Sequence, residues 1–170
     1  MHNRKKQQGF TLIELVVVIV ILGILAATAA PKFIDLTSDA NKSVLEAMGG
    51  TILSGAKLAY AKSIIQGVQS QELANIDIDN DGNNDVEVKY GYPSGDRTKG
   101  IANVIALDKD WAYGDRFNGG AFVVSHSSLA GFGGITNNNI PITRTSCYLT
   151  YTPPTAAGLL PTVTYSTNGC

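Results

Sequence analysis

The fold is decided by residues 9–31, which read GFTLIELVVVIVILGILAATAAP. Between Phe10 and Ala30 this segment contains one charged residue, Glu14. A helix of these 21 residues extends about 31 Å at 1.5 Å per residue, which is the thickness of the hydrocarbon core of a bilayer. A buried helix of a soluble domain seldom needs so long an apolar run. We therefore expect residues 10–30 to form a transmembrane helix.

Charge is distributed unequally around this segment. Three of the thirteen basic residues (Arg4, Lys5 and Lys6) precede it, and the chain from Phe10 onward carries ten basic and fourteen acidic residues, a net charge of −4. This balance argues against a nucleic-acid partner. Basic residues on the N-terminal side of an apolar helix keep that end in the cytoplasm. The chain beyond residue 31 is therefore expected on the far side of the membrane.

The position of Gly9 does not fit an ordinary secretory signal. In such a signal the small-residue cleavage site follows the apolar segment, which is removed with the leader. Here the small residue comes first, directly after the short basic leader MHNRKKQQ.

Residues 8–28, which include the run Gly-Phe-Thr-Leu-Ile-Glu at residues 9–14, resemble the class III signal of type IV prepilins. The resemblance implies that a prepilin peptidase cuts between Gly9 and Phe10 on the cytoplasmic face, so that residues 1–9 are a leader peptide. It also implies that the new amine of Phe10 is methylated. The apolar helix is then retained, and identical chains polymerise through it.

Glu14 is the lone carboxylate in the apolar segment, four residues from the new terminus. An ionised side chain is costly in hydrocarbon and normally requires a partner. In type IV pilins the corresponding glutamate pairs with the terminal amine of a neighbouring subunit, so the resemblance makes Glu14 an assembly residue. The alternative is that Glu14 extends to the cytoplasmic interface of a single anchored protein.

Gly23 and Pro31 are expected to weaken the long helix. Glycine costs backbone entropy, and proline removes a donor and clashes with the preceding turn. In the family the matching residues bracket a segment that loses helical structure in the filament. An ordinary kink is the alternative for residues 23–31.

We expect residues 31–66 to continue as an amphipathic helix and residues 67–170 to form a β-rich globular head domain. An apolar stripe with helical spacing comprises Val44, Leu45, Met48, Ile52, Ala56 and Ala59. Short alternating segments at 86–90, 121–125, 147–151 and 162–166 predict antiparallel strands. We expect an α+β protein with the type IV pilin fold, in which the long helix packs on a small antiparallel sheet.

The chain contains two cysteines, Cys147 and Cys170. An even number of cysteines in an exported chain indicates a disulfide rather than reactive thiols. The bridge would close a C-terminal loop. In pilins such a loop lies on the filament surface, which makes residues 148–169 a candidate interaction surface.

Residues 77–85 are rich in acidic and amide side chains. The spacing matches a calcium-binding loop, with Asp77, Asp79, Asp81 and Asp85 at positions 1, 3, 5 and 9 and the Asn83 carbonyl at position 7. Position 12, where a bidentate glutamate belongs, is Val88. Calcium is therefore a possible ligand, and a solvated turn leading into the next strand is the alternative. No cofactor is required by the sequence.

No pattern in the sequence indicates an enzyme. His126 has serine neighbours, but adjacent residues on a strand point to opposite faces and do not form a triad. Residues 131–134 (GFGG) lack the lysine and hydroxyl residue of a phosphate loop. The aromatic residues Tyr90, Tyr92, Trp111 and Tyr113 are candidates for a glycan-stacking face, although spaced aromatics more often belong to a core.

Within the type IV pilins the chain is most similar to the mannose-sensitive haemagglutinin pilins. The similarity lies in residues 15–31, 90–93 (YGYP) and 110–111 (DW), and in Cys147 with Tyr151 and Thr152 ahead of Cys170. It implies a major subunit of a surface fibre for adhesion and biofilm formation, with a receptor that the sequence leaves unknown. Before assembly the chain would sit in the inner membrane with its head in the periplasm, and the pilus assembly machinery of the inner membrane would act on it. After assembly it would be extracellular. The alternatives are a type II secretion pseudopilin, a minor pilin, and a singly anchored periplasmic binding protein.

Overall fold

A computed structural model describes residues 10–116 and 119–170, with only the backbone described at residues 29–35. The chain divides into two compact units, Met1–Ser38 and Asp39–Cys170. We call the second unit the head.

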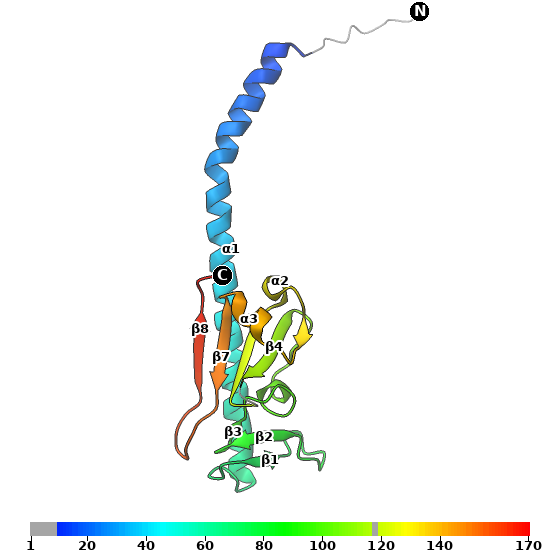
Figure 1. The fold of residues 1–170 in the computed structure, drawn as a ribbon, viewed down its shortest axis with the longest axis vertical. Coiled ribbons are helices and arrows are strands. Elements are labelled where there is room, and N and C mark those ends of the chain that lie inside the picture. Colours follow the sequence, from blue (N-terminus) through cyan, green and yellow to red (C-terminus); the bar gives the residue numbers. More distant parts are fainter. Residues whose placement is uncertain (1–9, 117–118) are drawn as a thin grey trace, which may run out of the picture. The chain divides into compact units, whose positions relative to one another are not determined.

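The first element, α1, spans Leu12–Ile65 and contributes to both units (Figure 1). Its backbone is helical through Gly23 and Pro31. The expectation that the chain loses helical structure between these residues concerns the filament, and it stays a prediction. Among the residues that the structure describes, no helix has an apolar stretch long enough to cross a membrane.

The head contains two sheets. The smaller has the strand order β1-β2-β3 and is antiparallel, with β1 at Ala74–Ile76, β2 at Val86–Lys89 and β3 at Tyr92–Pro93. The larger has the order β6-β4-β5-β7-β8. Its strands are β4 (Trp111–Arg116), β5 (Ala121–His126), β6 (Gly134–Ile135), β7 (Tyr148–Thr152) and β8 (Thr162–Ser166). All its pairs are antiparallel except β4 with β6.

Three short helices complete the head: η1 (Ile101–Asn103), α2 (Ser127–Ala130) and α3 (Ile140–Arg144). The last two lie against the larger sheet on the face opposite α1. A small cluster on that face joins Ile142 of α3 to Ala112 and Val123 of the sheet. The larger sheet is therefore covered on both faces.

The main core lies between α1 and the larger sheet. It contains Leu45, Met48, Ile52 and Ala56 from the helix and Phe122, Val124, Leu149 and Tyr151 from the sheet. Ala59, one turn further along α1, packs instead on Ile76, Val86 and Val88 of the smaller sheet. The apolar stripe predicted from the sequence is thus confirmed at five of its six positions. Val44 is the exception, because its side chain is 43% exposed.

Tyrosines join α1 to both sheets. The rings of Tyr60 and Tyr92 stack with their centroids 4.4 Å apart, and the Tyr151 hydroxyl donates to the Pro93 carbonyl at 2.7 Å. Burial raises the pKa of Tyr151, and the neighbouring Tyr92 raises it further. Burial likewise raises the pKa of Tyr92, to which Tyr60 also contributes. Both hydroxyls therefore stay neutral, and that of Tyr151 serves as a hydrogen-bond donor within the core.

Candidate functional site

The start of α1 is closed by a reciprocal pair of hydrogen bonds between Thr11 and Glu14. The Thr11 N–H and hydroxyl donate to Glu14 Oε2 at 2.9 and 2.8 Å, and the Glu14 N–H donates to Thr11 Oγ1 at 3.3 Å. This is a capping box, which satisfies backbone donors at a helix start. The sequence signal for it is Thr-x-x-Glu at residues 11–14. In the single chain, Glu14 therefore has a partner within its own first turn.

The apolar side chains that follow are uncovered. Phe10 is 86% exposed, and the large apolar residues of the next fifteen positions are between 43% and 80% exposed. A continuous exposed apolar surface is typical of a site of protein–protein or membrane interaction. Gly9, the residue before the predicted cut, lies outside the described residues.

The acidic loop, residues 77–85, brings three carboxylates together. Ligand oxygens of Asp77, Asp79 and Asp81 all lie within 4.8 Å of one another. The N–H groups of Asn80 and Gly82 donate to Asp77 at 2.6 and 2.9 Å. Partial burial raises the pKa of Asp77, but these N–H groups together with that of Asp81 lower it more, and the net pKa is below its usual value. These hydrogen bonds therefore favour the ionised form of the carboxylate.

The C-terminal end of α1 holds this loop. Lys62 Nζ donates to Asn80 Oδ1 at 2.7 Å, and Gln66 Nε2 donates to the Asp77 carbonyl at 2.8 Å. Val88, at the twelfth position of the calcium pattern, is fully buried in β2. A hydrocarbon side chain cannot ligate an ion, so any ion would depend on the three clustered carboxylates and carbonyl oxygens of the loop. Oxygen ligands of this kind suit calcium.

A disulfide joins Cys147 to Cys170, as predicted. It closes the hairpin of β7 and β8, and the C-terminal turn is further held because the Gly169 N–H donates to the Ser146 carbonyl at 2.9 Å. Asn41 Nδ2 of α1 donates to the Cys170 carbonyl at 3.0 Å. The last strand is thus fastened both to its neighbour and to the helix.

Comparison with known proteins bears on the N-terminal segment most directly. Residues 4–30 match the model of the prokaryotic N-terminal methylation motif. The chain is 48% identical over 61 residues to the type IV narrow pilus major component PilA5 of Thermus thermophilus, an alignment that covers 36% of this chain and 49% of that protein. It is 44% identical over 63 residues to a fimbrial protein of Pseudomonas aeruginosa, covering 37% of this chain and 38% of that one.

The chain carries a prepilin-type methylation motif and is homologous to type IV pilins. The chain spans half or less of the length of these curated pilin relatives. A third relative is the type II secretion system core protein G of Pseudomonas aeruginosa, which is 51% identical over 42 residues, covering 25% of this chain and 30% of that protein. No solved structure matches the chain.

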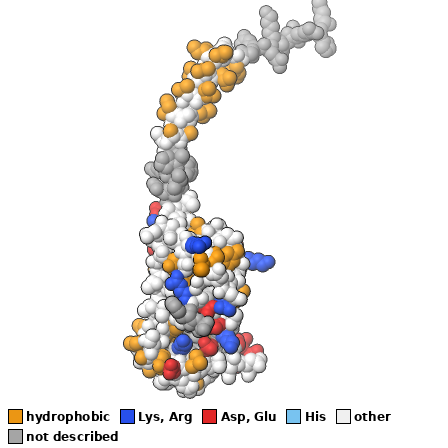
Figure 2. Space-filling model, viewed as in Figure 1, with side chains coloured by type: hydrophobic (Ala, Val, Ile, Leu, Met, Phe, Trp, Pro, Cys, Tyr) orange, Lys and Arg blue, Asp and Glu red, His pale blue; other side chains and the backbone are white. Residues whose placement is uncertain are grey.

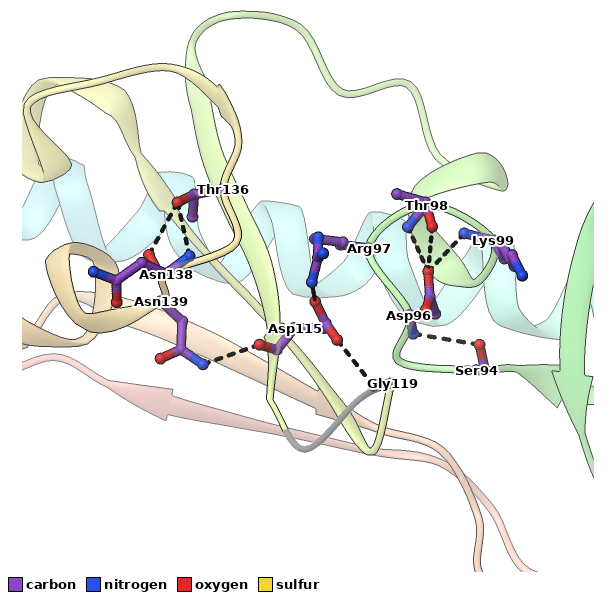
Figure 3. A network of polar contacts seen from close by, with 10 residues as sticks. All are labelled: Ser94, Asp96, Arg97, Thr98, Lys99, Asp115, Gly119, Thr136, Asn138 and Asn139. Carbon is purple, nitrogen blue, oxygen red and sulfur yellow. Dashed lines mark hydrogen bonds and ion pairs between the residues drawn. The ribbon is translucent and has the colours of Figure 1, made fainter.

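A polar network that the sequence did not indicate holds two loops of the pilin-like head together (Figure 3). Arg97 forms an ion pair with Asp115 of β4, whose side chain is only 4% exposed. The second oxygen of Asp115 accepts from the Gly119 N–H at 2.9 Å, and its carbonyl accepts from Asn139 Nδ2 at 3.0 Å. Asp115 therefore links the segment after β3 to the start of the α3 region.

Asp96, next to this ion pair, shapes its own loop. Its Oδ1 accepts from the N–H groups of Thr98 and Lys99 at 2.7 and 3.0 Å and from the Thr98 hydroxyl at 2.6 Å. Burial raises the pKa of Asp96, but these hydrogen bonds and the charge of Arg97 outweigh it, and the net pKa is lowered. The network is structural, since its acceptors are occupied by groups of the same chain.

The aromatic residues proposed for a glycan face are not equivalent. Tyr92 is 6% exposed and belongs to the core. Trp111 contacts His126 edge-on with ring centroids 5.7 Å apart, and His126 Nδ1 lies 2.7 Å from the Ser128 hydroxyl at the start of α2. These contacts assign Tyr92 and His126 to packing and capping.

Proposed function

We propose that this chain is a major structural subunit of a type IV pilus of the mannose-sensitive haemagglutinin type. The observation that carries the proposal is the methylation motif at residues 4–30, which leads into an apolar helix with uncovered side chains. The pilus components among its relatives support the same role. The role is structural rather than catalytic, and it serves adhesion to surfaces and biofilm formation.

The proposed life history has two stages. Residues 10–30 first hold the subunit in the inner membrane, with the head in the periplasm. A prepilin peptidase cuts the chain on the cytoplasmic face, and the pilus assembly machinery of the inner membrane then takes it up. The helices of many copies then bundle, and the filament becomes extracellular. Both environments cover the apolar side chains that are exposed on the single chain.

Mass spectrometry of the mature chain tests this proposal. The expected product lacks residues 1–9 and begins at a methylated Phe10, and electron microscopy of sheared surface material shows long fibres that contain it. An uncut chain, or cleavage after residue 30, would contradict the proposal and favour a singly anchored periplasmic binding protein.

A pseudopilin of a type II secretion system is the second candidate, because core protein G is among the relatives. The C-terminal disulfide favours the pilin, since major pseudopilins commonly lack such a loop. The two roles differ in the assembly that the chain forms. Abundant long fibres support the pilin, whereas correct processing without surface fibres at good expression supports the pseudopilin or a minor pilin.

We also propose that the acidic loop binds calcium, with Asp77, Asp79 and Asp81 supplying carboxylate oxygens, and with the Asn83 carbonyl and Asp85 as the further ligands that the sequence spacing suggests. The three clustered carboxylates support this. Without a twelfth-position glutamate the site is expected to be weak, with a dissociation constant on the order of 10⁻⁴ to 10⁻³ M.

Calorimetric titration of the full-length chain in detergent micelles tests the calcium site. Binding heat is expected for the wild type and is lost in the double variant Asp79→Asn with Asp81→Asn. Asp108→Asn, which removes an exposed carboxylate elsewhere, is the matched control and should bind as the wild type does. If the wild type shows no heat and no thermal stabilisation at millimolar calcium, the loop is a solvated turn.

A further inference from the structure

The loop between β7 and β8 presents an apolar projection to solvent. All six residues from 155 to 160 are exposed, and Leu159 and Leu160 are 51% and 73% exposed. We call residues 155–160 the apolar tip. Hydrophobic side chains gather over this loop at the lower left of the head in Figure 2. The tip carries no charged residue.

The apolar tip is bounded on both sides by prolines and by paired strand ends. Pro153 and Pro154 are buried on one side, Pro161 follows on the other, and Thr152 pairs with Thr162 at the hairpin end. A turn within the tip is closed by the Leu159 N–H, which donates to the Ala156 carbonyl at 3.3 Å. A surface held in one conformation before binding loses little entropy when it docks.

A groove of matching character lies on another side of the head. It has a volume of about 610 Å³ and runs between the outer face of α1 and the loop at residues 104–106. Its helix residues are Ala47, Gly50, Thr51, Ser54, Gly55 and Leu58. The groove also lacks charged residues, and Leu58 is 60% exposed within it.

Packing within the chain does not explain why residue 50 is a glycine. A Cβ on Gly49 would lie 2.0 Å from the Tyr165 hydroxyl oxygen, and one on Gly55 would lie 3.0 Å from Ile105 Cγ2, so both glycines lie against side chains of their own chain. A Cβ on Gly50 would meet nothing within 4 Å. Glycine in the middle of a helix is unfavourable relative to alanine. A side chain at this position would, however, enter the groove.

We propose that the apolar tip of one subunit docks into the groove at Ala47–Leu58 of a second copy of this chain. The inference rests on the proposed polymer. An open filament requires a heterologous contact, in which two different surfaces of the same molecule fit each other. The tip and the groove are two such surfaces: one projects, the other is concave, and neither bears a charge that docking would bury unpaired.

Leu160→Asp tests the tip. Its side chain is exposed, so the thermal midpoint of the monomer should not change, whereas the concentration of subunit needed for filament growth should rise about tenfold or more. Ile65→Asp is the matched control, because Ile65 is 80% exposed on α1 outside the groove. Equal assembly of Leu160→Asp and the wild type would overturn the inference.

Gly50→Leu tests the groove from the other side. Because the space around a Gly50 Cβ is open, the monomer should unfold at the same or a higher temperature, yet its assembly should fall as that of Leu160→Asp does. In filaments of the double variant Ser54→Cys with Leu160→Cys, an intermolecular disulfide should form. Wild-type assembly by Gly50→Leu, or no cross-link, would contradict docking at this groove. Failure of the wild-type chain itself to form filaments would instead reject the proposed function.

Discussion

Glu14→Gln is expected to abolish filament growth while leaving the chain intact and processed. The reason is electrostatic: we expect the carboxylate to neutralise the Phe10 amine of a neighbouring subunit inside an apolar helix bundle. Removing one partner of a buried ion pair leaves the other charge uncompensated, at a cost of roughly 3–5 kcal/mol. The concentration needed for assembly should therefore rise by a hundredfold or more, at about 1.4 kcal/mol per factor of ten.

Because Glu14 belongs to a capping box, glutamine is the substitution that separates the effect of its charge from the effect of its hydrogen bonds. Glutamine at this position still accepts from the Thr11 N–H, so Glu14→Gln removes the charge and keeps the helix start. Thr11→Ala is the complementary control, because it weakens the cap by about 1 kcal/mol and keeps the charge. We expect filaments from Thr11→Ala and none from Glu14→Gln, scored by electron microscopy after mass spectrometry has verified the mature terminus. Undiminished fibres from Glu14→Gln would refute the ion-pair mechanism.

The elements that the sequence predicted well are those whose side chains alternate or recur with a clear period. The strand expected at 162–166 is β8 without change, and the one expected at 121–125 is β5, which extends one residue further. The apolar stripe of α1 was readable because burial on one face of a helix imposes its period on the sequence. The prediction that Val44 is buried with the stripe was wrong, because Val44 lies at the edge of that helix face.

The remaining differences come from turns and long-range pairing. The strand expected at 86–90 ends at Lys89, because Tyr90 adopts a positive φ of 49° and forms the turn to β3 with Gly91. The two-residue strands β3 and β6 are too short to carry a periodic signal. Which strands share a sheet depends on contacts between distant residues, so the division into two sheets was not predictable from local pattern.

The candidate sites also divide into those that local sequence predicts and those that depend on contacts between distant residues. The disulfide and the acidic loop follow from residue types and spacing within one segment. The Arg97–Asp115 pair joins residues eighteen positions apart, one on the loop after β3 and one in β4, and neither residue has a sequence context that marks the other. The apolar tip and the groove could be recognised only from the exposure of their side chains in the structure. The sequence does not show whether an apolar residue in a loop is buried or exposed.

Loss of the Cys147–Cys170 disulfide is expected to have the largest effect on the stability of the head. The bridge closes a loop with a sequence separation of 23, for which chain entropy predicts a loss of roughly 3 kcal/mol of unfolding free energy. For a domain of this size the thermal midpoint should fall by roughly 10 °C. Circular dichroism of the oxidised and reduced full-length chain measures the difference.

The structure indicates which part of the head should be destabilised first when the disulfide is lost. The bridge, together with the Asn41 contact to the Cys170 carbonyl, fixes the end of β8, and β8 in turn places Tyr165 on Gly49 of α1. Reduction should therefore increase amide exchange in β8 and at the C-terminal turn before it does so in β5. Cys170→Ser should reproduce the lowered midpoint and should not respond further to reductant. Equal midpoints for the oxidised and reduced wild type would mean that strand pairing alone holds the hairpin, and that the apolar tip does not depend on the bridge for its position.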